Sequence, residues 1–262
     1  MGSQLALVTG ASSGIGFELA KQFAQHDFDL VIAAEDDDLA PAANALEGFG
    51  ATVQTVQVDL ATREGVEQLY ERIARPVDAA ALNAGIGMGG AFATDTDLEQ
   101  ELRIVDLNCR STVHLAKLLL GDMVARDAGR ILITSSIAAT MPGSFQAVYN
   151  ASKSFTQSFG LALRDELKDT NVTVTLLMPG PTDTAFFERA DMLDTRVGAS
   201  DSKDDPEDVA RDGFEALMAG KERVVSHSLS TKLQGRGSRF IPDKAKALMH
   251  RRMAEPGSAK EE

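Results

Sequence analysis

Short apolar runs alternate with longer stretches of helical periodicity along most of this chain. Runs rich in Val, Ile, Leu and Ala that end in glycine or polar residues are typical of strands buried on both faces. The predicted strands are Gln4 to Thr9, Asp29 to Ala34, Thr52 to Val58, Val77 to Leu82, Arg130 to Thr134, Val172 to Leu177 and Arg223 to Ser226. The pattern predicts an α/β fold, a doubly wound parallel sheet of about seven strands with helices on both faces.

The helical stretches indicate one domain. The predicted helices follow Gly16 and span Leu39 to Phe49, Arg63 to Ala74, Leu98 to Arg126, Tyr149 to about Lys168 and Glu207 to Ala219. Residues 185–206 mix aromatic and charged side chains without a long period, which is typical of a mobile substrate lid. We predict one domain over residues 1–226, including this lid, and a C-terminal helical extension over 227–262.

Composition narrows the function classes. Hydrophobic residues make up 44% of the 262 residues, enough to bury a sizeable core. The net charge of −13 argues against a nucleic-acid partner, because binding a phosphate backbone needs a basic face. The one cysteine, Cys109, can form neither an intrachain disulfide nor a cysteine-rich metal site, and we expect no metal.

The sequence shows no basic leader and no long apolar segment, so we expect a cytoplasmic protein that does not contact a membrane. The locally basic tail is expected to pack against an acidic surface of its own or a neighbouring subunit.

A glycine-bearing loop, Thr9 to Gly16, stands between the first strand and the first helix. Backbone N–H groups and the helix N-terminus beside such a loop favour a bound pyrophosphate, which glycines allow to approach closely. An acidic run, Glu35 to Asp38, ends the second strand, where a carboxylate can bind an adenosine ribose and would repel a 2′-phosphate. In this context the loop predicts a Rossmann-like dinucleotide-binding fold. Taken singly, the alternatives are a flexible turn and an acidic helix start.

Tyr149 and Lys153 are four residues apart in a predicted helix, so they share one face. A phenol titrates near ~10 and carries protons poorly at neutral pH, but a nearby cation lowers its pKa. The pair therefore has the chemistry of an acid/base unit. Asn108 is a polar side chain within an apolar helical stripe, where it either mends a backbone irregularity or serves a site.

Several motifs occur in a fixed order along the chain. They are Thr9 to Gly16, Asn83-Ala84-Gly85, Asn108, Ser136, Tyr149 with Lys153, and Pro179-Gly180. This set resembles the short-chain dehydrogenase/reductase family, with all motifs at family-like spacing over residues 1 to about 184 and a weaker match beyond. The resemblance implies a nicotinamide cofactor and a catalytic group of Asn108, Ser136, Tyr149 and Lys153. Ser136 is preferred over Ser135 because the family's serine typically lies thirteen residues before the tyrosine.

The resemblance also implies a role for each residue. Ser136 would hydrogen-bond the reacting oxygen, and Tyr149 would exchange a proton with it while hydride passes to or from C4 of the nicotinamide. Lys153 would lower the Tyr149 pKa and hold the nicotinamide ribose, and Asn108 would position a water that links Lys153 to solvent. The implied cofactor contacts are Gly10, Ser12, Ser13, Gly14, Ile15, Gly16, Glu35, Asp59, Leu60, Asn83, Ala84, Gly85, Tyr149, Lys153, Pro179, Gly180, Thr182 and Thr184. Within this set, Asp59 with Leu60 resembles the adenine contact, and Thr182 and Thr184 resemble the residues that hold the carboxamide and phosphates.

Family members that prefer NADP usually carry an arginine or lysine where this chain has Glu35 and Ser13. We therefore predict a preference for NAD, with NADP as the alternative. NAD-preferring members often place an acid one residue earlier, where this chain has Ala34. The resemblance further implies a homo-oligomer, a tetramer or dimer built on the long helices.

The resulting hypothesis is an oxidoreductase that acts on a secondary alcohol or ketone. The candidate apolar pocket residues, which favour a hydrophobic substrate, are Met88, Phe92, Met141, Phe145, Phe186, Phe187 and Met192. A catalytically silent dinucleotide-sensing or scaffold protein on the same fold is an alternative, since a fold does not determine a function. A nucleotide-sugar epimerase or dehydratase is a further alternative, although the C-terminal portion is short for a sugar-nucleotide domain.

Overall fold

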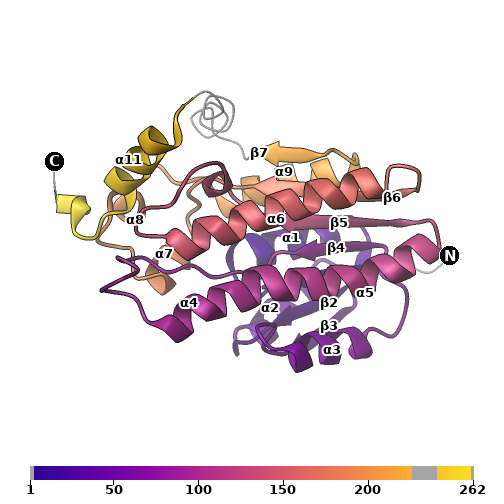
Figure 1. Cartoon of the computed structure of the whole chain (residues 1–262). Coiled ribbons are helices and arrows are strands. Elements are labelled where there is room, and N and C mark those ends of the chain that lie inside the picture. The colour runs from indigo at the N-terminus through magenta and orange to yellow at the C-terminus, as the bar shows by residue number, and fades with distance from the viewer. Residues whose placement is uncertain (1–2, 226–240, 261–262) are drawn as a thin grey trace.

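The structure is a computed structural model that describes residues 3–225 and 241–260. This part of the chain contains a seven-stranded parallel sheet in the order β3-β2-β1-β4-β5-β6-β7 (Figure 1). The strands are β1 Gln4–Thr9, β2 Phe28–Ala34, β3 Val53–Gln57, β4 Ala79–Leu82, β5 Gly129–Thr134, β6 Val172–Met178 and β7 Arg223–Val225. The predicted doubly wound sheet is confirmed, and its topological switch point lies between β1 and β4.

Helices cover both faces of the sheet. They are α1 Gly14–Gln25, α2 Leu39–Glu47, α3 Arg63–Arg72, α4 Leu98–Val105, α5 Ser111–Ala125, α6 Ala147–Glu166, α7 Phe186–Arg189, α8 Arg196–Ala199, α9 Pro206–Met218 and α11 Asp243–Ala254. One apolar cluster joins the sheet to α1, α2 and α9, and a second joins it to α3, α5 and α6 (Figure 1). In β5, Ile131 and Ile133 belong to the second cluster and Leu132 to the first. Burial on both faces explains why the strands are continuous apolar runs.

The long helix predicted over Leu98 to Arg126 is interrupted, so that prediction was wrong in detail. A π-helical turn, η1 Asp106–Arg110, separates α4 from α5. Asn108 lies in this turn, and its backbone carbonyl accepts a hydrogen bond from Thr112 Oγ1 at 2.8 Å. Such turns insert one residue into a helix and occur frequently at functional sites. The polar residue in the apolar stripe therefore marks a backbone irregularity.

Residues 185–206 form the short helices α7 and α8 with connecting turns. Here Phe187, Ala190 and Met192 are buried in a small cluster of their own, which Ala254 of α11 completes. Of the predicted C-terminal extension, residues 227–240 lie outside the described residues, as does Ser226. Helix α11 packs on α8, so the described part of the tail contacts its own lid segment (Figure 1).

Among the described residues, the longest helices are too short or too polar to span a membrane.

Candidate active site

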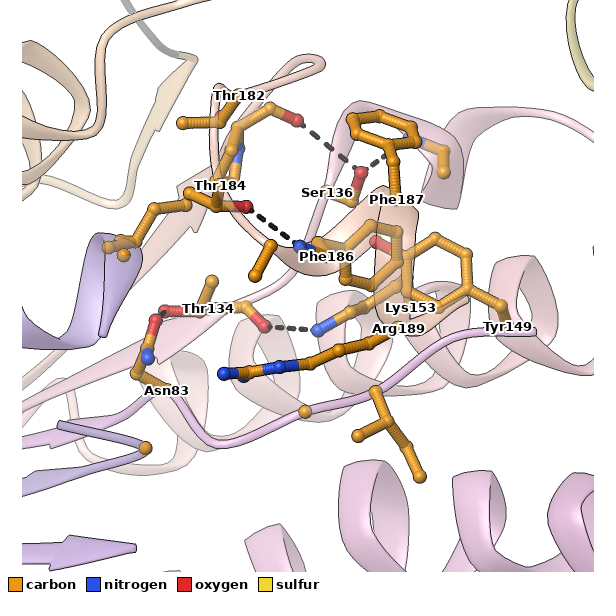
Figure 2. A pocket seen from close by; sticks show the side chains of 18 of the residues that line it. Asn83, Thr134, Ser136, Tyr149, Lys153, Thr182, Thr184, Phe186, Phe187 and Arg189 are labelled. Carbon is orange, nitrogen blue, oxygen red and sulfur yellow. Dashed lines mark hydrogen bonds between the residues drawn. The ribbon is translucent and has the colours of Figure 1, made fainter. Parts of the chain in front are cut away.

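A cavity of about 590 Å³ opens at the carboxyl edge of the sheet, beside the switch point (Figure 2). It is lined by the glycine-bearing loop, the ends of β2, β4, β5 and β6, and residues of α6, α7 and α11. All the cofactor contacts expected from the sequence line this cavity, together with Ser136. Of the four expected catalytic residues, Asn108 is the one that does not line it. Segments distant in the sequence thus converge where doubly wound sheets bind ligands.

The glycine-bearing loop leaves room for a ligand group at the start of α1. Gly10 has φ +65°, and a Cβ there would lie 2.9 Å from Ala84 Cα. A Cβ on Gly16 would lie 1.9 Å from the Gly10 carbonyl oxygen, so a side chain cannot fit between the loop and α1. The Ser13 side chain makes no capping hydrogen bond at the N-terminus of α1. The loop therefore presents uncapped N–H groups, and it fits the diphosphate of a dinucleotide.

Arg189 of α7 is a cavity residue that the sequence analysis missed. Its side chain extends along the cavity toward the loop, where Nη2 lies 3.5 Å from Ser13 Oγ (Figure 2). Among the described residues, no carboxylate forms an ion pair with it, although the protein carries a net charge of −13. An unpaired guanidinium beside a helix N-terminus attracts an anion. No motif surrounds Arg189 in the sequence, so only the fold identifies it.

Ser136, Tyr149 and Lys153 meet at the opposite end of the cavity (Figure 2). Lys153 Nζ donates to the Thr134 carbonyl at 3.0 Å and lies 5.8 Å from the centre of the Tyr149 ring. Ser136 Oγ accepts from the Ala138 N–H at 3.1 Å and donates to the Pro179 carbonyl at 3.4 Å, whereas the Ser135 hydroxyl donates to the Lys153 carbonyl at 2.9 Å. Ser135 therefore anchors helix α6, and the choice of Ser136 as the catalytic serine stays a prediction.

Burial controls the protonation of Tyr149 and Lys153. Burial raises the pKa of Tyr149 to about 12, although the Ser136 hydroxyl acts in the opposite direction. It lowers the pKa of Lys153 to about 8. Withdrawal from water disfavours the charged form of each group, and for Tyr149 it outweighs the lowering expected from Lys153, so that role of Lys153 stays a prediction. At neutral pH the site holds a neutral phenol and an ammonium.

Asn108 does not line the cavity, and its side chain forms hydrogen bonds within the protein. Its Nδ2 donates to the Ile86 carbonyl and to Ser152 Oγ, both at 2.9 Å, and its Oδ1 accepts from the Ile86 N–H at 3.0 Å. A Cβ on Gly85 would lie 3.1 Å from Asn108 Oδ1 and 3.3 Å from Lys153 Nζ, so both groups approach the same glycine. The side chain thus joins the segment after β4 to α6, one residue from Lys153. A catalytic role for Asn108 stays a prediction.

The acidic side chains near the ends of β2 and β3 differ in the partners that they bind. Arg103 of α4 forms an ion pair with Glu35 and binds both oxygens of Asp59, with its Nη1 2.9 Å from Asp59 Oδ2. Asp36 accepts a hydrogen bond from Ser12 Oγ at 2.9 Å, and its buried Oδ1 has no partner in the described part of the chain. Glu35 and Asp36 both line the cavity, and Asp36 is the one of the two that forms no ion pair among the described residues. The sequence analysis chose Glu35 because the two acids are adjacent and Arg103 is distant in sequence.

Other expected contacts line the cavity while serving the fold. Asn83 accepts from Thr134 Oγ1 at 3.0 Å and donates to the Thr9 carbonyl at 3.3 Å, so it connects three neighbouring strands. Thr182 Oγ1 donates to the Gly180 carbonyl at 3.0 Å. The polar groups of these side chains are therefore partly occupied within the protein.

The expected apolar pocket is smaller than predicted. Met141, Phe186 and Phe187 line the cavity. The other four candidates, Met88, Phe92, Phe145 and Met192, do not. Phe92 is 55% exposed, and Met192 is buried in the cluster that it forms with Phe187, Ala190 and Ala254. Hydrophobicity alone cannot distinguish core, surface and pocket positions.

Comparisons with known proteins agree with this geometry. The family model for short chain dehydrogenases matches residues 4–192. An uncharacterised oxidoreductase of Staphylococcus saprophyticus is 32% identical over 220 residues, which cover 82% of this chain and 91% of the relative.

Solved structures share the fold. A short-chain dehydrogenase/reductase from Burkholderia phymatum, in complex with NAD, superposes with a TM-score of 0.81 at 23% identity, covering 89% of this chain and 92% of that one. A short-chain dehydrogenase from Sphingobium yanoikuyae, in complex with NADPH, superposes with a TM-score of 0.78 at 25% identity, covering 90% and 93%. Because the family model spans most of the chain and the observed fold agrees with it, the chain belongs to the short-chain dehydrogenase/reductase family of NAD(P)-dependent oxidoreductases.

Proposed function

We propose that this protein interconverts an apolar secondary alcohol and its ketone, and that it favours ketone reduction at neutral pH. The observation that carries the proposal is the meeting of Ser136, Tyr149 and Lys153 at one end of a cavity whose other end fits a dinucleotide. The preferred direction of the reaction follows from the protonation state of Tyr149. A phenol whose pKa is raised to about 12 holds its proton at neutral pH and can donate it to an oxygen that becomes an alkoxide.

Each residue has a separate task in this reaction. Ser136 holds the substrate oxygen beside the Tyr149 hydroxyl, and Tyr149 transfers its proton to that oxygen. The Lys153 ammonium, fixed by the Thr134 carbonyl, stabilises the negative charge that the phenol then carries. The bound nicotinamide would supply the hydride. Phe186, whose ring centre is 5.2 Å from that of Tyr149, limits the access of water and favours an apolar substrate.

An absorbance screen of ketones and alcohols at 340 nm with both reduced and both oxidised cofactors tests this function. We expect turnover of apolar ketones at pH 7 to exceed oxidation of the corresponding alcohols. Tight cofactor binding without turnover across the panel would instead support the silent dinucleotide sensor. A cofactor that never leaves during turnover would support the epimerase alternative.

We further propose a preference for NAD over NADP, and we assign it to Asp36. Asp36 lines the cavity and forms no ion pair among the described residues, whereas Glu35 is partly neutralised by Arg103. A 2′-phosphate charge about 5 Å from a carboxylate is repelled by roughly 3 kcal/mol at an effective dielectric of ~20, before screening by salt. Arg189 supports binding of the diphosphate that both cofactors share.

Replacing Asp36 by asparagine should reduce the preference for NADH over NADPH at least tenfold, because the substitution removes the repulsion and keeps the shape. The measurement is the dissociation constant of each cofactor by fluorescence titration. Asp38→Asn is the matched control, since Asp38 carries the same charge and does not line the cavity. Wild-type protein that binds NADPH tenfold more tightly than NADH would refute the assignment.

We also propose that the protein is a homo-oligomer. Leu98, Leu102 and Val105 of α4 and Phe155 of α6 are all more than 40% exposed, which is unusual for such large apolar side chains on neighbouring helices. A second copy would bury them. Light scattering should give a dimer or tetramer, and Leu102→Glu should shift the protein toward the monomer, whereas a wild-type monomer would contradict the proposal.

A further inference from the structure

Helix α11 forms one wall of the cavity through His250, Met253 and Ala254. It is attached to the segment that precedes α6, where Ser144 Oγ donates to the Ala247 carbonyl at 3.3 Å. The Arg251 guanidinium lies 4.8 Å from the centre of the Phe145 ring. The C-terminal helix is therefore fixed to the segment that connects the Ser136 turn to the Tyr149 helix.

The hydrogen bonding of His250 defines its chemical state. The side chain is 5% exposed, and Nδ1 lies 3.0 Å from the Ser144 carbonyl oxygen. A carbonyl oxygen only accepts, so Nδ1 carries the hydrogen and Nε2 carries a lone pair. Burial also lowers the pKa of His250, which favours this neutral form.

The second ring nitrogen, Nε2, has no hydrogen-bond partner among the described residues. No group among the described residues donates to Nε2, and Nε2 is not one of the fully buried atoms that lack a partner. Because His250 lines the cavity and is otherwise enclosed, the open side of the ring is the cavity side. The cavity wall includes the apolar side chains of Met141, Phe187 and Met253. An acceptor in such a wall loses its hydrogen bonds with water unless a ligand donates to it.

We propose that His250 Nε2 is a specificity-determining acceptor for a hydroxyl or N–H group on the substrate, remote from the reacting carbonyl. The substrate class is then an apolar ketone or alcohol that carries a second, hydrogen-bond-donating group. This inference rests on the proposed function, because it assigns the same cavity to the substrate. It does not depend on which cofactor is used.

Three matched ketones test the assignment. They are 4-(4-hydroxyphenyl)cyclohexanone, which carries a donor, 4-(4-methoxyphenyl)cyclohexanone, which does not, and 4-(4-oxocyclohexyl)benzoic acid, which is an anion. We expect wild-type kcat/KM for the hydroxyl compound to exceed that for the methoxy compound about tenfold, as one hydrogen bond allows. His250→Leu should remove this preference, so that kcat/KM for the hydroxyl and methoxy compounds becomes equal within about threefold.

Two further variants separate the role of His250 from folding. His250→Gln keeps an acceptor and should retain most of the preference, whereas Met249→Leu, at an exposed position on the same helix, should behave as wild type. Calorimetric titration of the three compounds in the presence of NAD gives the same preference without turnover. Equal binding of the hydroxyl and methoxy compounds, tightest binding of the anion, or an unchanged preference in His250→Leu would overturn the proposal. If the preference appears in binding but no ketone is reduced, the proposed reaction fails and the assignment of His250 stands.

Discussion

Tyr149→Phe is expected to lower kcat for ketone reduction by about 10³-fold or more and to leave the dissociation constant of the cofactor within about threefold. The phenylalanine ring keeps the packing against Phe186 and removes only the hydroxyl that donates the proton. General acid catalysis contributes roughly 10²–10⁴ to a rate, and Tyr149 is the acid in the proposed reaction. Stopped-flow measurement of a single turnover separates the chemical step from cofactor release.

The chain has one other tyrosine, which supplies the control. Tyr70 on α3 hydrogen-bonds Asp122 and lies away from the active-site cavity. Tyr70→Phe should therefore retain wild-type kcat. Turnover by Tyr149→Phe at the wild-type rate would show that another group delivers the proton.

Lys153→Met should abolish most activity and yet stabilise the protein without cofactor at pH 7. Burial lowers the pKa of Lys153 from 10.5 to about 8, which corresponds to roughly 3 kcal/mol of unfavourable free energy for the ammonium in the folded state. Loss of the hydrogen bond to the Thr134 carbonyl offsets about 1–2 kcal/mol of this gain. We expect a net rise in Tm of about 3 °C.

The pH dependence of this stabilisation has a definite sign. Below pH 8 the folded wild type holds a buried ammonium, so the advantage of the methionine variant is fully present. Between about pH 8 and 10.5 the folded protein loses that proton before the unfolded chain does, so wild-type stability rises and the advantage disappears. Thermal unfolding of both proteins at pH 7 and pH 10 measures the difference. Lys168→Met, which removes an exposed ammonium, should change Tm by less than about 1 °C; equal Tm values for Lys153→Met and wild type at pH 7 would contradict the burial argument.

Local sequence patterns were sufficient to predict much of the candidate site. The spacing of Tyr149 and Lys153 places both on one helix face, and strand ends at Leu82, Thr134 and Met178 bring the following loops to one edge. These relations depend on helix and strand periodicity, which nearby residues control. The π-helical turn at Asn108 was visible only as an odd polar residue, because an inserted residue leaves the surrounding apolar spacing nearly unchanged.

The residues that the sequence analysis missed are those whose roles depend on contacts between distant segments. Arg103 selects between Glu35 and Asp36, which are adjacent in sequence, by pairing with the first. Arg189 reaches Ser13 across the cavity, and His250 lines the cavity only because α11 binds the segment at Ser144. No local spacing signals any of the three.

The amino-acid sequence by itself determined the parallel sheet, the dinucleotide loop and the family, because apolar periodicity and ordered motifs are local properties of the chain. Only the tertiary structure decided which acid Arg103 neutralises, how burial shifts the pKa values of Tyr149 and Lys153, and which residues of 185–206 and of α11 form the walls. Those features depend on desolvation and on pairing between groups far apart in the sequence, which exist only after the chain has folded.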